Sequence, residues 1–125
     1  MSEAYNMPVQ DFADGRFGGK STVTGHHTEA FAETAIEFLR EQTNGMPFLC
    51  YVAFKSPHDP RTAIPKWHQY YATNLPSVPA NYLPLHPIDN GEMKVRDEKL
   101  LSWPRTAEAV RKELGDYYAC ISHLD

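Results

Sequence analysis

The feature that most constrains the fold is a run of seven apolar residues, Phe-Leu-Cys-Tyr-Val-Ala-Phe, at positions 48–54. The run shows no polar alternation and is rich in β-favouring residue types, so it predicts a strand covered on both faces, as in a parallel sheet. The backbone of such a strand must pair with neighbouring strands, and the chain holds no second run of comparable quality. We therefore expect one slice of a larger α/β sheet that does not fold on its own.

An amphipathic helix is predicted before this strand, over about residues 28–43. Phe31, Ala35 and Leu39 recur every four residues and form an apolar stripe typical of a helix that packs on a core. Thr28 is a suitable N-cap, because its hydroxyl can accept a hydrogen bond from the first turn. The sequence thus predicts the order helix, then strand.

A proline-rich stretch, residues 55–105, follows the strand. Its prolines remove backbone donors and fix φ, so they allow at most a short helix at 66–73. The remainder is expected to be a long ordered loop, such as a lid or a wall that faces the substrate. Thr106 is expected to cap a last helix over about 106–125. Residues 1–25 show no sustained period and are expected to be irregular.

Composition excludes several classes of partner. Lys and Arg total 12 against 16 Asp and Glu, so the formal net charge of −4 argues against binding nucleic acid or an anionic membrane. The longest apolar run is too short to span a bilayer, and the first residues lack the pattern of a signal peptide. Cys50 and Cys120 both lie in apolar patterns and are expected to be core residues.

The strongest candidate for chemistry is His58, which lies just past the predicted strand between Pro57 and Asp59. In open α/β sheets, loops at the carboxyl ends of strands form the ligand crevice. An imidazole there could donate a hydrogen bond to an anionic substrate oxygen, whereas the alternative is a loop histidine bonded to local carbonyls. Arg61 could bind an anion, or it could form a salt bridge with Asp59 or a later carboxylate.

The other chemistry-bearing residues are weaker candidates. His26 and His27 are adjacent, so they cannot easily face one metal ion, and a solvated loop before the helix is expected. His123 and Asp125 lie two apart on the last helix and point in different directions, which argues against a metal pair. Nothing marks Ser56 as a nucleophile activated by a neighbouring base.

Several segments in unbroken order resemble type I sulfatases of the alkaline-phosphatase-like α/β superfamily. The resemblance covers about residues 26–125, and within it His58 matches the histidine of the family's S/A-P-H-x-P motif, which contacts the sulfate or its leaving oxygen. The matching segments are residues 47–62, 75–84, 95–98, 104–108 and 116–125.

The resemblance implies a slice of a sandwich in which helices flank a mixed sheet, and it implies sulfate-ester hydrolysis. The family uses a formylglycine nucleophile, made in a C/S-x-P/A-x-R motif, and a divalent metal, usually calcium. It acts on sulfated small molecules or glycans, commonly in the periplasm, the lysosome or outside the cell. This chain contains no such motif and lacks the family's metal-binding aspartates. We therefore expect both groups to come from the remainder of the catalytic domain, and the chain alone to be inactive.

Two alternatives remain open from the sequence. The same superfamily includes phosphodiesterases and phosphonate hydrolases, because one scaffold can serve several chemistries. A non-catalytic binding module that uses the Tyr- and Trp-rich loop would also fit the residues. The nucleophile motif distinguishes the first alternative from a sulfatase, and metal-independent sugar binding would favour the second.

Overall fold

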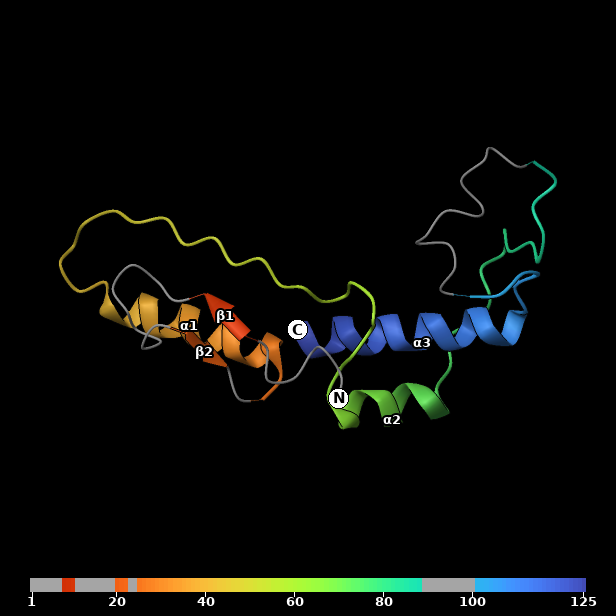
Figure 1. Ribbon diagram of the computed structural model, residues 1–125, viewed down its shortest axis with the longest axis horizontal. Coiled ribbons are helices and arrows are strands. Elements are labelled where there is room, and N and C mark those ends of the chain that lie inside the picture. The colour runs from red at the N-terminus through yellow and green to blue at the C-terminus, as the bar shows by residue number, and fades with distance from the viewer. Residues whose placement is uncertain (1–7, 11–19, 23–24, 89–100) are drawn as a thin grey trace.

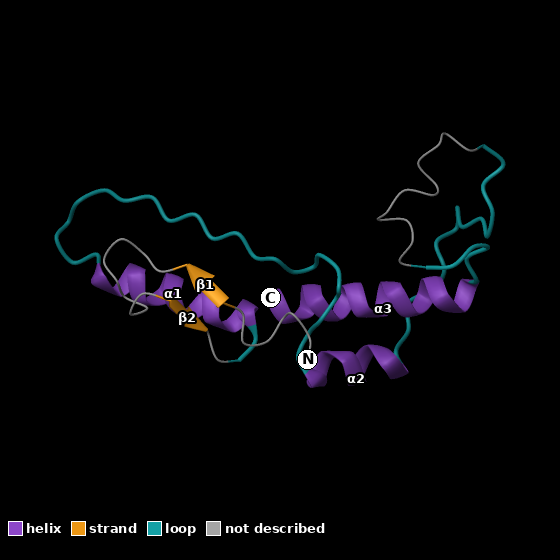
Figure 2. Ribbon diagram, in the orientation of Figure 1, coloured by secondary structure: helices purple, strands orange, loops and turns teal. Residues whose placement is uncertain are grey.

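The computed structural model describes residues 8–10, 20–22, 25–88 and 101–125. The described elements are two strands, β1 (Pro8–Gln10) and β2 (Lys20–Thr22), and three helices, α1 (His27–Glu41), α2 (Pro65–Thr73) and α3 (Ala107–Leu124). Figure 1 shows α2 lying along α3, whose last turn lies beside the start of α1. Figure 2 shows that long loops connect these helices.

The two strands correct the expectation that residues 1–25 are wholly irregular. β1 and β2 pair antiparallel, with Val9 opposite Ser21. The expectation failed because each strand has only three residues, which is too short for a periodic pattern to appear in the sequence.

Local signals account for the ends of the helices. The predicted N-cap of α3 is confirmed, because the Thr106 hydroxyl accepts a hydrogen bond from Ala109 N at 3.1 Å. α2 begins at Pro65, where a proline loses no helical hydrogen bond. The N-cap of α1 is His26 rather than the predicted Thr28, since the His26 ring accepts from Thr28 N.

The small apolar core of the described residues lies between α2 and α3. Ala63, Ala119 and Cys120 are buried there, with Trp67 and Tyr71 packed against them. Burial of Cys120 agrees with its predicted place in a core, whereas Cys50 is only half-buried.

Residues 48–54 do not form the predicted strand. Figure 1 shows them in a long extended loop that follows α1, and none of them belongs to a strand. Leu49 and Tyr51 are 88% and 87% exposed. A strand exists only where another strand pairs with its backbone, and β1 and β2 pair with each other. The apolar stripe of α1 is likewise uncovered around Leu39, which is exposed. The mixed sheet flanked by helices is therefore not formed by the described residues.

Candidate active site

The loop that carries His58, residues 55–63, is held on one side by the start of α1. The backbone of the loop turns where His58 N donates to Lys55 O at 2.9 Å. The hydroxyls of buried Ser56 and Thr28 lie 3.4 Å apart, and His26 Nε2 donates to Thr62 O at 3.0 Å. These contacts attach both ends of the loop to one helix terminus.

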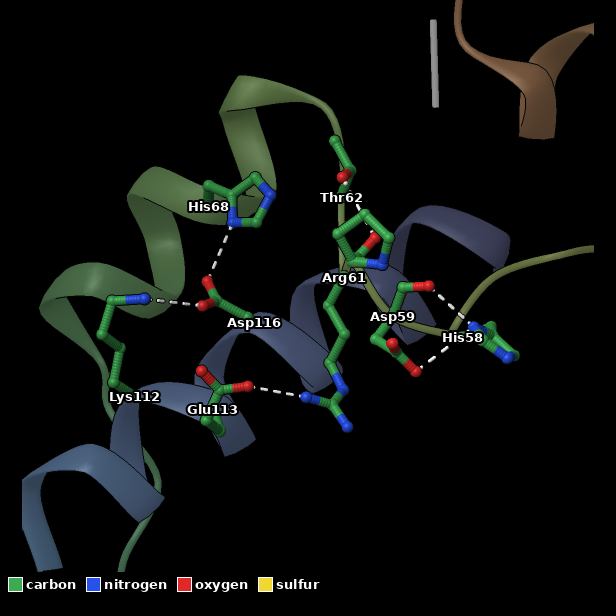
Figure 3. A network of polar contacts seen from close by, with 9 residues as sticks. His58, Asp59, Arg61, Thr62, His68, Lys112, Glu113 and Asp116 are labelled. Atoms are coloured by element: carbon green, nitrogen blue, oxygen red, sulfur yellow. Dashed lines mark hydrogen bonds and ion pairs between the residues drawn. The ribbon is translucent and has the colours of Figure 1, made fainter. Parts of the chain in front are cut away.

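The same loop is held on its other side by α2 and α3 (Figure 3). Arg61 Nη1 donates to Glu113 Oε2 of α3 at 2.6 Å. Ala63 N donates to His68 Nε2 of α2 at 2.9 Å, and His68 Nδ1 in turn donates to Asp116 Oδ1 at 3.2 Å. Three helices therefore fix the path of the loop through polar contacts.

His58 projects from this loop with one ring nitrogen engaged and the other directed outward. Its Nδ1 lies 2.7 Å from Asp59 O and 3.3 Å from Asp59 Oδ1. Because a carbonyl oxygen can only accept, Nδ1 carries the proton, and Nε2 of the neutral ring is an acceptor. Figure 3 shows Nε2 pointing away from Asp59, and the side chain is 65% exposed. Nε2 has no hydrogen-bond partner among the described residues, so it is accessible to a ligand.

Comparison with known proteins decides the family. The family model described as Sulfatase matches residues 2–125. The chain belongs to the sulfatase family. Neither a curated protein sequence nor a solved structure matches the chain. The resemblance carried by the sequence segments around His58 is therefore confirmed at the level of the family.

Arg61 of this sulfatase chain forms a salt bridge with a later carboxylate, which is one of the two roles that the sequence left open. Its guanidinium contacts the later carboxylate, Glu113, and both side chains are about one-quarter to one-third exposed. A guanidinium bonded in this way anchors the loop rather than presenting its donors to an anion.

His68 is also structural, although an imidazole beside a carboxylate resembles a catalytic pair. Its Nε2 accepts the Ala63 amide proton, so the nitrogen that would abstract a proton is already occupied. Asp116 accepts from both His68 and Lys112, and its hydrogen bond and negative charge raise the pKa of Lys112.

The expectation of a solvated loop at His26 and His27 is wrong. The two residues are only 1% and 4% exposed, and the ring of His123 lies 4.5 Å from that of His26, centroid to centroid. The sequence could not reveal this burial, because the covering ring comes from the far end of the chain. Both nitrogens of His26 are engaged, by Thr28 N and by Thr62 O.

The described residues do not fit a metal centre or an activated nucleophile. Within those ranges no group of three or more His, Cys, Asp or Glu is arranged to hold a metal ion. Ser56 is bonded to the Thr28 hydroxyl rather than to a base. Cys120 is fully buried, and burial raises the pKa of its thiol, which disfavours the reactive thiolate. No helix in the described part of the sulfatase chain has the length and apolarity to cross a membrane.

Proposed function

We propose that this chain forms part of the sulfate-binding site of a sulfate-ester hydrolase, and that His58 Nε2 contacts an oxygen of the substrate. The observation that carries the proposal is the geometry of His58, whose Nδ1 is held by Asp59 while Nε2 faces outward. The sulfatase family supports sulfated substrates as a class, and small sulfated molecules or glycans fit that class.

The protonation state of His58 decides what it contributes. In the neutral ring with the proton on Nδ1, Nε2 can only accept a hydrogen bond. After protonation, Nε2 donates to an anionic oxygen, and the positive ring stabilises negative charge on the sulfate oxygens. The Asp59 carboxylate at 3.3 Å from Nδ1 faces the cationic ring with a compensating charge. His58 is therefore suited to bind the sulfate as an imidazolium.

The other parts of the reaction require groups that these residues do not supply. The sequence contains no C/S-x-P/A-x-R segment, and the described ranges contain no metal-holding group. We propose that the formylglycine and the divalent metal that the family uses are supplied by further polypeptide of the catalytic domain. The family's α/β sandwich belongs to the same proposal, and its sheet would cover exposed apolar side chains such as Leu49 and Tyr51.

The test compares His58→Ala with His86→Ala in the complete catalytic domain, using 4-nitrophenyl sulfate. His86 is exposed and serves as the matched control. We expect His58→Ala to lower turnover by roughly 10²-fold or more, the size of effect seen when a charge-stabilising donor is lost. We expect His86→Ala to leave turnover unchanged. Equal turnover of the two variants would remove His58 from the site, and a wild-type preference for a phosphate diester would replace the sulfatase assignment.

A further inference from the structure

Three histidines from opposite ends of the described chain meet in one buried cluster. His26 and His27 begin α1, and His123 lies in the last turn of α3. The ring centroids of His26 and His27 are 4.6 Å apart, and those of His26 and His123 are 4.5 Å apart. The His123 side chain is only 5% exposed. We call these three residues the histidine junction.

The hydrogen bonds of the histidine junction fit uncharged imidazoles. His26 must be in the neutral form with its proton on Nε2, because Nδ1 accepts the Thr28 amide proton and Nε2 donates to Thr62 O. Protonating His26 would place a proton on Nδ1 and break the bond that caps α1. Both nitrogens of His123 are buried, and neither has a hydrogen-bond partner among the described residues. Burial therefore opposes a charge on His123, and the Glu29 carboxylate compensates it only in part.

The charged groups around the junction mostly oppose protonation. Lys55 of the loop and the other two junction rings repel a charge on His27, and His68 of α2 repels a charge on His123. Glu29 of α1 acts in the opposite direction, because its carboxylate lies 3.7 Å from His123 Nε2, although its side chain is 55% exposed. Among the described residues, one half-exposed carboxylate faces the three buried rings, so the balance of these charges favours the neutral cluster.

We propose that the histidine junction is an acid-sensitive clasp, in which protonation of the imidazoles separates the start of α1 from the end of α3. Rings 4.5 Å apart cannot all become cations inside a buried cluster without strong mutual repulsion. The separation also removes the His26 contact with Thr62, so the loop that carries His58 loses one of its attachments. The clasp does not depend on the proposed sulfatase function.

Burial and the neighbouring positive groups lower the pKa of His27 from 6.5 to about 4, and burial is the main reason that the pKa of His123 is lowered. A histidine with a lower pKa in the folded chain binds fewer protons there than in the unfolded chain. The contribution of His27 to the stability of the folded chain is therefore fully present above pH 6.5, and it is lost as the pH falls from 6.5 to about 4. For His27 alone, the folded-to-unfolded ratio should fall about 30-fold between pH 7.5 and pH 5.

The decisive experiment follows amide hydrogen exchange and imidazole NMR signals of the wild-type chain, within the complete catalytic domain, from pH 7.5 to pH 4. We expect the first-turn amides of α1, including Ala30, to lose protection as the pH falls, while the amides of α2 keep theirs. We expect the His27 ring to begin titrating only below pH 5. Titration of His27 near pH 6.5, or protection of α1 that does not change with pH, would overturn the clasp.

Neutral variants provide the matched comparison. In wild type, His27 should contribute a factor of about 30 to the loss of α1 protection between pH 7.5 and pH 5. His27→Gln should remove this factor. His86→Gln replaces an exposed histidine and should leave the drop unchanged. Equal effects of the two substitutions would contradict the proposal. If His27→Gln does not fold, the wild-type titration still decides, because it needs no substitution.

Discussion

The ion pair between Arg61 and Glu113 should contribute measurably to stability, because it joins the side of the His58 loop to α3. Arg61 Nη1 lies 2.6 Å from Glu113 Oε2, and the two side chains are 26% and 31% exposed. Fully exposed pairs contribute about 0.2–1 kcal/mol, whereas removing one partner of a fully buried pair costs about 3–5 kcal/mol. A pair at this intermediate exposure should therefore cost about 1–2 kcal/mol when either partner is replaced by alanine.

The two single substitutions should differ in a definite order. Removal of Glu113 leaves a guanidinium whose Nε is already buried without a hydrogen-bond partner among the described residues. Removal of Arg61 leaves a carboxylate that water can reach. We therefore expect Glu113→Ala to lower the free energy of unfolding more than Arg61→Ala does.

A double-mutant cycle measured by urea denaturation tests this reasoning. The double variant should lose less than the sum of the two single losses, with a coupling energy of about 1 kcal/mol. With a urea m-value of about 1–3 kcal/mol/M, each single substitution should visibly lower the denaturation midpoint. Lys112→Ala is the control, because its exposed pair with Asp116 should contribute about 0.5 kcal/mol at most. Additive losses, or a larger loss for Lys112→Ala, would refute the argument.

Three further predictions concern α3 and the cysteines. Gly115→Leu should lower the free energy of unfolding by about 1–3 kcal/mol, because even a Cβ at this position would lie 3.1 Å from Leu75 Cδ2; no loss in urea denaturation would contradict the packing. Thr106→Ala should cost about 1 kcal/mol by removing the cap of α3, with Thr106→Ser as the variant that retains it. Cys50 should react with a thiol reagent in the folded chain while fully buried Cys120 reacts only on unfolding, and simultaneous labelling would contradict this order.

The parts of the fold that the sequence predicts well are those set by neighbouring residues. α1 covers 27–41 where the periodicity predicts 28–43, and α3 covers 107–124 where it predicts 106–125. α2 covers 65–73 where the sequence allows a short helix at 66–73, and the cap of α3 follows from a single residue, Thr106. Each of these signals acts within one helical turn, so a sequence read locally contains it.

The features that the sequence does not predict depend on distant partners. Burial of His26 requires the ring of His123, and the partner of Arg61 is 52 residues away. Two adjacent polar residues before a helix look solvated until the covering element is known. The apolar run at 48–54 predicts a strand only if other strands pair with it, and the described residues supply none. The exposed Nε2 of His58 also could not be read from its sequence motif.

The loop that presents His58 is held mainly by polar contacts, and this has a consequence for its geometry. In one of these contacts a histidine ring accepts a backbone proton, since His68 Nε2 accepts from Ala63 N, whereas in another His26 Nε2 donates to Thr62 O. A hydrogen bond fixes the direction of the backbone as well as its distance from the helix, whereas apolar packing is non-directional. Loss of one of these polar contacts should therefore change the path of the loop before it changes the apolar contact between α2 and α3. The outward direction of His58 Nε2 thus depends on contacts made by other residues of its loop.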